Sequence, residues 1–285
     1  MNLGVDVIYI INLKKDVYRK NRLIGIFKDH NITNYKFVSA IHGTELSSIP
    51  TMVQNKQIHT SFLDPNGNLT KNIYACALSH QLALKQFLSS KYETCLILED
   101  DITFTEEFYK FTYLHNLSDL TDNIKKSDYD VFFWGRQNDP KIGDKPTEWE
   151  YVYEPALYTS HYSAHAYQVH RESAKKLLDF ITPVKYAADV AIELSNLKIR
   201  SPKYNLIAQH RGRTDQVLLG DILKQIWEQN EAKELASATY EEVREGETRH
   251  NPCLEKGLGI NYLKFISLQA KNGTLLKDWV YIKVI

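Results

Sequence analysis

The chain has 285 residues, of which 43% are hydrophobic and 25% charged, as in soluble globular proteins. Its 35 basic and 35 acidic side chains cancel, so no overall charge favours nucleic acid or an anionic membrane as a partner. No run approaches the roughly 20 apolar residues that a membrane-spanning helix needs, so no transmembrane segment is expected. The apolar start lacks a basic leader and a cleavage site, so we expect a soluble, cytoplasmic protein.

The first elements along the chain have the pattern of a β-α-β unit. The β-rich run Val5–Leu13 precedes Asp16, a favourable N-cap for a helix over residues 17–28, and a second strand follows over residues 35–40. Such a unit pairs its two strands in parallel through a right-handed crossover. The polar stretch 44–72 then predicts a long loop across one edge of the sheet.

The next segments deliver three acids to the end of a buried strand. An amphipathic helix over residues 73–89 leads into the apolar strand 95–98, and Glu99, Asp100 and Asp101 follow at once. Neighbouring carboxylates repel unless a positive group lies among them, and a divalent cation suits that position. The alternative is that these acids only cap the helix that follows.

Beyond this acidic cluster the sequence predicts further strands and helices in alternation. They are a helix over 105–114, a strand over 130–135, a turn-rich stretch over 139–155, a strand over 163–170, a helix over 171–180, a short helix opened by Asp189, and a strand over 203–208. From Asp215 apolar residues recur at helical spacing, which predicts a helical C-terminal extension over 216–285 packed on a domain of residues 1–215. The alternation favours an α/β fold with a mostly parallel sheet flanked by helices.

Three cysteines, Cys76, Cys95 and Cys253, lie far apart in the sequence. They show no zinc-ligand spacing. We therefore interpret them as reduced thiols in the core or at the surface.

Six short motifs occur in the order found in one enzyme family. They are Ile8–Arg19 (IYIINLKKDVYR), Ala40–Gly43 (AIHG), Ala75–Lys85 (ACALSH followed by lysine), Leu96–Asp101 (LILEDD), Asp130–Gly135 (DVFFWG) and Ala164–Leu178 (AHAYQV followed by AKKLL). In this order they resemble glycosyltransferase family 25, the lipooligosaccharide and collagen-type galactosyltransferases, over about residues 5–215. Two positions depart from the family pattern: His42 replaces an acid or amide, and Ala75 replaces glycine.

The resemblance implies a GT-A-type fold, a Rossmann-like sheet with one nucleotide-sugar site. It implies a UDP-sugar donor and a Mn²⁺ or Mg²⁺ cofactor, held by Glu99 and Asp101 as an acid-x-acid pair and by His210 as a late histidine ligand. Oxygen ligands and a neutral imidazole suit these cations. The alternative for His210 is a basic turn on a solvated surface.

The resemblance also implies a set of donor-binding residues. They are Ile11, Asn12, Leu13, Arg19, Gly43, Ser79, His80, Asp100 and Arg211. Arginine is suited to bidentate contacts with phosphate, and Gly43 would let the backbone approach the ligand closely. For each of these residues packing or turn geometry is the alternative role, and His80 has a structural role as its alternative.

An inverting transfer needs a carboxylate that takes the proton from the attacking hydroxyl. The resemblance implies Asp189 for this role, with helix capping as its alternative role and Glu193 as the second candidate. The donor sugar is expected to be galactose, with UDP-GlcNAc and UDP-glucose as alternatives. A degenerate member that binds a nucleotide-sugar or a glycan without turnover is a further hypothesis, favoured by His42 and Ala75.

The expected acceptor is a hydroxyl of a glycan, a lipooligosaccharide or a hydroxylysine-bearing protein. Nucleic acid is not an expected partner, and a homodimer is left open. If the chain is viral, the expected compartment is the host cytoplasm.

Overall fold

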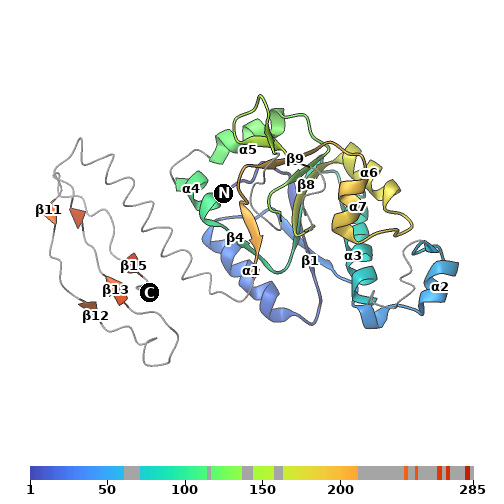
Figure 1. The fold of residues 1–285 in the computed structure, drawn as a ribbon. Helices are drawn as coiled ribbons and strands as arrows, with labels where there is room; N and C mark the ends of the chain where they lie inside the picture. Colours follow the sequence, from blue (N-terminus) through green and yellow to red (C-terminus); the bar gives the residue numbers. More distant parts are fainter. Residues whose placement is uncertain are drawn as a thin grey trace. The chain divides into compact units, whose positions relative to one another are not determined.

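The main sheet of this computed structural model has eight strands in the order β2-β1-β3-β8-β5-β9-β7-β6 (Figure 1). Its strands are β1 (Val7–Asn12), β2 (Tyr35–Ser39), β3 (Thr94–Glu99), β5 (Val131–Phe133), β6 (Lys145–Pro146), β7 (Val152–Glu154), β8 (Ala166–His170) and β9 (Ile199–Pro202). β1 pairs in parallel with β2 and β3, and β5 pairs in parallel with β9. β8 is antiparallel to both its neighbours, β3 and β5. The predicted α/β class with a mostly parallel sheet is confirmed.

The structure describes residues 1–60, 71–113, 117–136, 144–156 and 163–210, together with five short strands beyond them. Two compact units are distinguished. One comprises Met1–Phe104 and Asn116–His210, and the other Thr105–His115 and Arg211–Ile285. The eight-stranded sheet belongs to the first, which we call the core unit.

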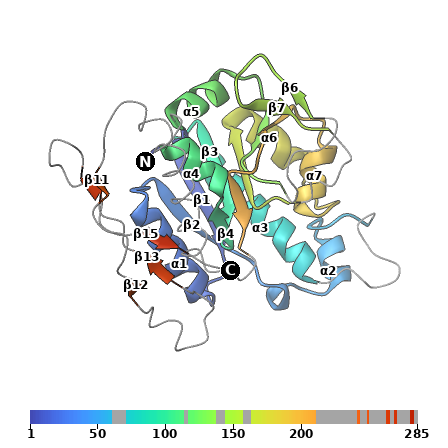
Figure 2. The same cartoon turned by 60° about the vertical axis from the view of Figure 1, so that its left-hand side comes forward.

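Helices cover both faces of the sheet. The helical segments are α1 (Val17–Asp29), η1 (Gly43–Glu45), α2 (Ile49–Gln54), α3 (Lys71–Leu88), α4 (Glu106–Tyr113), α5 (Leu117–Lys126), α6 (Arg171–Phe180) and α7 (Ala188–Leu194). In the core unit α3, α6 and α7 lie on one face, and α1 and α5 lie on the other (Figures 1 and 2). Among the described residues no helix is long and apolar enough to cross a membrane.

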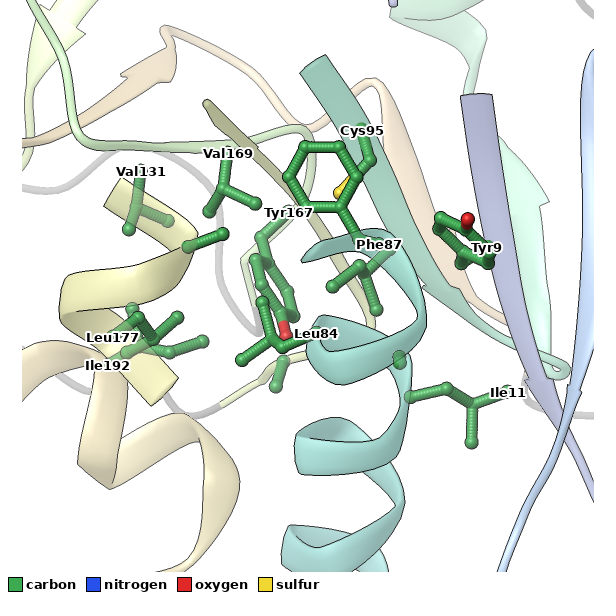
Figure 3. Close-up of a cluster of buried hydrophobic side chains, with 14 of the residues drawn as sticks. Tyr9, Ile11, Leu84, Phe87, Cys95, Val131, Tyr167, Val169, Leu177 and Ile192 are labelled. Atoms are coloured by element: carbon green, nitrogen blue, oxygen red, sulfur yellow. The ribbon is translucent and has the colours of Figure 1, made fainter. Parts of the chain in front are cut away.

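A buried cluster of side chains joins the sheet to the face formed by α3, α6 and α7 (Figure 3). Tyr9 and Ile11 of β1 contribute to it from the sheet, and Leu84, Phe87 and Leu177 contribute from α3 and α6. Every residue of β1 is buried, because each face of this strand is covered. This double burial explains why the strand is almost uniformly apolar, and it places the polar end of the strand at the sheet edge.

Several elements go beyond the sequence expectation. The predicted loop 44–72 contains η1 and α2, which begins with a Ser48 N-cap and a proline in its first turn. The sequence pattern does not predict α5, because the buried face of this helix consists of only Leu120, Thr121 and Ile124. It does not predict β9 either, because this strand is short and ends at Pro202, a residue that is uncommon inside strands.

A second, two-stranded sheet in the core unit pairs β4 (Ile102–Phe104) with β10 (Ile207–Gln209) in antiparallel fashion. The sequence predicts the last strand over residues 203–208, so β10 begins later than expected. The register places Gln209 opposite Ile102, immediately after the acidic cluster. This pairing brings a late segment of the chain to the carboxyl end of β3.

The helical spacing that starts at Asp215 lies outside the described residues. The segments described beyond it are the short strands β11 (Glu241–Glu242), β12 (Thr248–Arg249), β13 (Tyr262–Lys264), β14 (Leu268–Gln269) and β15 (Val280–Ile282). β11 pairs with β14, and β13 pairs with β12 and β15. These five segments are therefore extended, where the sequence predicts a helical extension.

Gly135, two residues past the end of β5, is required by a close backbone approach. A Cβ atom at this position would lie 1.7 Å from the carbonyl oxygen of Ile207 and 2.6 Å from Nε2 of His165. The first contact is with backbone in the strand that pairs with β4, so it cannot be relieved by rotating a side chain. Gly25 in α1 differs, because a Cβ atom added there would have nothing within 4 Å.

We expect Gly135→Ala to destabilise the protein by about 3 kcal/mol or more, at the upper end of overpacking costs. Gly25→Ala is the matched control and should stabilise by about 0.5–1 kcal/mol, because alanine loses less backbone entropy in a helix. Urea unfolding of both variants tests the pair. Equal stability of the two variants would contradict the close approach at Gly135.

Candidate functional site

The carboxyl ends of β1, β2 and β3 meet at one edge of the sheet. The register pairs Ile11 with Glu99, and Asn12 with Ser39, so three strands end side by side. In α/β sheets, ligands bind in the crevice outside these strand ends. The polar residues that follow each strand are therefore brought together by the topology.

A cavity of about 250 Å³ opens at this edge, and we call it the first cavity. Residues from the ends of all three strands and from α3 line it. Those predicted from the sequence are Ile11, Leu13, Arg19, Gly43, Ser79, His80, Glu99, Asp100 and Asp101. Nine of the predicted site residues are thus assembled around one space.

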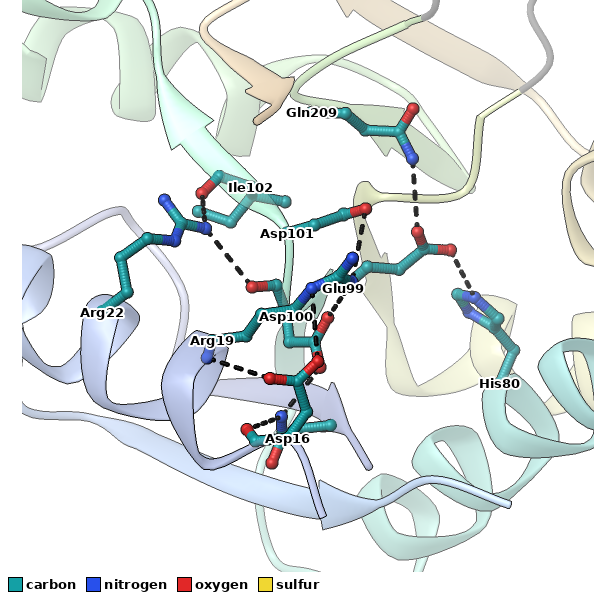
Figure 4. Close-up of polar contacts among 10 residues, drawn as sticks. Asp16, Arg19, Arg22, His80, Glu99, Asp100, Asp101, Ile102 and Gln209 are labelled. Atoms are coloured by element: carbon teal, nitrogen blue, oxygen red, sulfur yellow. Dashed lines mark hydrogen bonds and ion pairs between the residues drawn. The ribbon is translucent and has the colours of Figure 1, made fainter. Parts of the chain in front are cut away.

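Asp100 ties the end of β1 and the start of α1 to the end of β3 (Figure 4). The side-chain amide of Asn12 donates to Oδ2 of Asp100 at 2.7 Å, and the guanidinium of Arg19 donates to Oδ1 at 2.9 Å. Asp16 caps α1, as predicted, by accepting from the backbone N–H of Arg19. The family resemblance predicts that Asn12 binds the donor, whereas the structure gives its amide to Asp100.

Arg19 supplies a positive charge within the acidic cluster. Its Nη1 lies 2.9 Å from Asp100 and 3.7 Å from Asp101, and its Nε lies 3.4 Å from Asp16. The repulsion among neighbouring carboxylates is therefore partly offset by the protein itself. The guanidinium side chain stays 46% exposed and borders the first cavity, so it is accessible to an anionic ligand.

Asp101 is the member of the acidic cluster whose environment satisfies it least. Burial, together with the nearby charge of Glu99, raises the pKa of Asp101 to about 6. Its Oδ1 is buried and has no hydrogen-bond partner among the described residues. An orphaned carboxylate oxygen beside a second carboxylate fits a hard divalent cation, which takes oxygen ligands.

Glu99 is held between α3 and β10. Its Oε1 lies 3.3 Å from Nε2 of His80, and its Oε2 accepts from Gln209 at 3.5 Å (Figure 4). Burial opposes ionisation of Glu99, but the bond to His80 and the charge of that residue lower the pKa of the carboxyl. Burial also disfavours the charged imidazole, yet the bonds to Cys76 and Glu99 raise the pKa of His80. His80 and Glu99 therefore form an ion pair at the wall of the first cavity.

The conformation of the chain after β2 explains why residue 43 is a glycine and why a histidine fits at position 42. His42 is the N-cap of η1, and its Nδ1 accepts from the backbone N–H of Thr44, as an acid or amide would do. A Cβ on Gly43 would lie 2.2 Å from the side-chain oxygen of Asn72. The Ser79 hydroxyl, predicted to bind the donor, donates to Ala75 and accepts from the chain after β2.

His210 follows β10 directly. Its backbone N–H donates to the carbonyl oxygen of Asp101 at 2.5 Å, which places the two predicted metal ligands next to each other along paired strands. This proximity comes from the β4–β10 pairing, which the sequence pattern does not indicate. Arg211 lies outside the described residues.

Asp189 lies in the first turn of α7 and lines a second cavity of about 270 Å³. Glu99 and Cys76 line both cavities, so the two spaces adjoin. The capping alternative for Asp189 is wrong, because Ala187 is the N-cap and the Asp189 carboxylate accepts only from the N–H of Val190 in the contacts described. Glu193, the second candidate base, does not line either cavity.

Sequence reasoning missed two residues that touch this site. Cys76 lies one helical turn before His80 and lines both cavities, and the spacing of four residues on one helix was the available signal. Gln209 contacts Glu99 from β10, and no signal in the sequence connects two residues so far apart. Each reaches the site through tertiary packing.

A comparison with protein families matches residues 5–192, more than half of the chain, to the family described as glycosyltransferase family 25 (LPS biosynthesis protein). The chain is similar to procollagen galactosyltransferase 2 from Homo sapiens, at 30% identity over 139 residues. That alignment covers 47% of this chain and 21% of the human protein. The chain thus spans about a fifth of the length of this relative.

Two further relatives show the breadth of the similarity. The putative glycosyltransferase R655 of Acanthamoeba polyphaga mimivirus is 30% identical over 158 residues, which is 54% of this chain and 44% of that protein. The probable inactive glycosyltransferase 25 family member 3 of Rattus norvegicus is 26% identical over 139 residues, which is 47% of this chain and 23% of that protein. The names of these relatives thus include both a galactosyltransferase and a probable inactive family member.

The pKa of Asp101 predicts how stability depends on pH. The folded protein holds this proton more tightly than the unfolded chain, so stability is lost as pH rises from about 4 to about 6. In the absence of added metal we expect Asp101→Asn to be more stable than the wild type at pH 7.5, by on the order of 2 kcal/mol. Near pH 4 the two proteins should be similar. Urea unfolding with a chelator at both pH values measures the difference.

Asp130→Asn is a control for which we expect the opposite change in stability at pH 7.5. Burial opposes its ionisation, but bonds from the Lys198 N–H and the Ser173 hydroxyl lower the pKa of its carboxyl. Its stabilising contribution is present above the unfolded pKa and is lost as pH falls through the folded value. Asp130→Asn should therefore destabilise at pH 7.5. An Asp101→Asn variant that loses stability at that pH as well would refute the assignment.

Proposed function

The chain belongs to glycosyltransferase family 25, and on that premise we propose that it transfers a hexose from a UDP-sugar to an acceptor hydroxyl, with inversion and with Mn²⁺ or Mg²⁺. Galactose is the sugar we propose, because similar proteins are named as galactosyltransferases. The acceptor we propose is a hydroxyl on a glycan or a protein. One observation carries the proposal: Glu99 and Asp101 line a cavity at the strand ends, and Asp101 has a buried oxygen with no hydrogen-bond partner among the described residues.

The first cavity is the proposed donor site. Ile11 and Leu13, at the end of β1, give it an apolar wall suited to a nucleobase, and Gly43 allows the chain after β2 to pass close to Asn72 of α3. Arg19 presents an exposed guanidinium beside the acidic cluster, where it would contact the diphosphate of the donor. Asn12 does not contact the ligand in this proposal and instead orients Asp100.

The residues present fit the proposed cation. Two carboxylates, one with this orphaned oxygen, form a hard oxygen donor set, and His210 is adjacent to Asp101 through the backbone. A cation bound by Glu99, Asp101 and His210 would act as a Lewis acid that neutralises the departing diphosphate. Asp100 is left out of this set, because its oxygens accept from Asn12 and Arg19 and its charge is already paired with Arg19.

The second cavity is the proposed acceptor site, with Asp189 as the base. Its carboxylate would accept the proton of the acceptor hydroxyl while that oxygen bonds to the anomeric carbon and the carbon–diphosphate bond breaks. Because Glu99 lines both cavities, the donor and the acceptor would meet beside this residue.

We expect the protein to release UDP from UDP-galactose in the presence of Mn²⁺, and to lose this activity when the metal is chelated. Asp101→Ala should abolish UDP release, because it removes the orphaned oxygen. Asp189→Asn should lower transfer by about 10²–10⁴-fold, the usual contribution of general base catalysis. A coupled UDP assay over a panel of acceptors, repeated with UDP-GlcNAc and UDP-glucose, measures these effects and identifies the donor.

Glu193→Gln is the matched control, since this acid lies on the same helix but lines neither cavity. It should retain activity. Loss in Glu193→Gln with retention in Asp189→Asn would transfer the role of base to Glu193. UDP binding without release in every donor and acceptor combination would overturn the enzyme proposal and favour a nucleotide-sugar-binding protein.

A further inference from the structure

A second set of metal-ligand types lies beside the acidic cluster. Cys76 and His80 lie on successive turns of α3, and Glu99 lies at the end of β3. One ligand atom from each of these side chains lies within 4.8 Å of the others. Cys76 is exposed, whereas His80 is buried, so the set is open to solvent at the cysteine and enclosed at the histidine.

One distance within this set matches tetrahedral coordination. Nε2 of His80 and Oε1 of Glu99 are 3.3 Å apart. Two ligands of a tetrahedral zinc ion, each at about 2.0–2.1 Å, are separated by about 3.3 Å. The two atoms therefore already have the spacing that a shared ion requires.

The surroundings of His80 orient its ring for this role. Nδ1 lies 3.2 Å from the hydroxyl of Tyr167, and both residues are buried, with their rings stacked. Metal-binding histidines usually donate their other ring N–H to such a partner, which fixes the tautomer and the ring orientation. A cation bound at Nε2 would replace the proton that this atom shares with Glu99, while Nδ1–H donates to Tyr167.

The chemistry of the set differs from that of the carboxylate pair. A thiolate, an imidazole and a carboxylate suit Zn²⁺ or another thiophilic cation, whereas carboxylate oxygens alone suit Mn²⁺ or Mg²⁺. Three protein ligands would leave a fourth position for another ligand, and Cys76 and Glu99 line both cavities. An arrangement of three ligands and one open position is typical of zinc sites that exchange ligands.

We propose that Cys76, His80 and Glu99 bind Zn²⁺ or a similar thiophilic divalent cation. Glu99 belongs to both this set and the proposed catalytic pair with Asp101, so one side chain is shared by two cation sites. Occupancy by Zn²⁺ would hold Glu99 on the α3 side and inhibit transfer, a consequence that rests on the proposed function. The binding itself does not depend on turnover.

Cobalt titration of the full chain tests the binding directly. Co²⁺ is the probe, because a thiolate–cobalt charge-transfer band reports the cysteine, and visible bands report tetrahedral geometry. We expect one equivalent of Co²⁺ to produce both signals, and Zn²⁺ to displace it. Cys76→Ser should remove the charge-transfer band and weaken Zn²⁺ binding by at least about tenfold. Tyr167→Phe should keep the band and weaken binding by about tenfold, as loss of a supporting partner does.

Cys253→Ser is the control, because it removes a thiol of the same chain that is not in this set. It should keep the band. A band that persists in Cys76→Ser, or that disappears in Cys253→Ser, would overturn the site, as would Zn²⁺ binding that Cys76→Ser leaves unchanged. Failure of the proposed function would instead appear as absence of Mn²⁺-dependent UDP release with the cobalt signals intact, so the two failures are distinguishable.

Discussion

The site depends on one buried carboxylate, that of Asp100. It accepts from Asn12 at the end of β1 and from Arg19 on α1, and so fixes the place where two parallel strands end. Hydrogen bonds to charged groups are each worth about 1.5–3 kcal/mol, and removing the acceptor would leave two donors without their partner. Asp100 therefore fixes the backbone on which Glu99 and Asp101 are presented, and it keeps the Arg19 charge beside them.

Three consecutive acids acquire three different environments as a result. Asp100 is paired, Glu99 has a lowered pKa because His80 contacts it, and Asp101 has a raised pKa because burial and Glu99 oppose its charge. Environments that separate the pKa values of neighbouring carboxylates are characteristic of functional sites. Of these three acids, Asp101 is the one whose charge its surroundings offset least, so it would gain most from a further positive partner. The loss of stability that this buried charge causes is expected of a site built for a ligand.

Much of this arrangement follows from local sequence. The apolar strand before Glu99, the helix that contains His80 and the Asp16 cap are encoded by periodicity and capping, so they were predictable. The role of Arg19 as an internal counter-ion was not, since a local pattern does not show which charge a side chain reaches. The same holds for Gln209 and Cys76, which reach the site through the pairing of β10 with β4 and through the packing of α3 on the sheet.

Glu99 contacts residues from both sides of the site. One of its oxygens faces His80 and the other faces Gln209, so the carboxylate is held from two sides and borders both cavities. A cation that prefers oxygen is favoured on the side of Asp101, and one that prefers sulfur is favoured on the side of Cys76. Because one carboxylate cannot be optimally placed for both, the two cations should bind with negative coupling. The identity of the bound metal would then determine whether Glu99 faces the proposed donor.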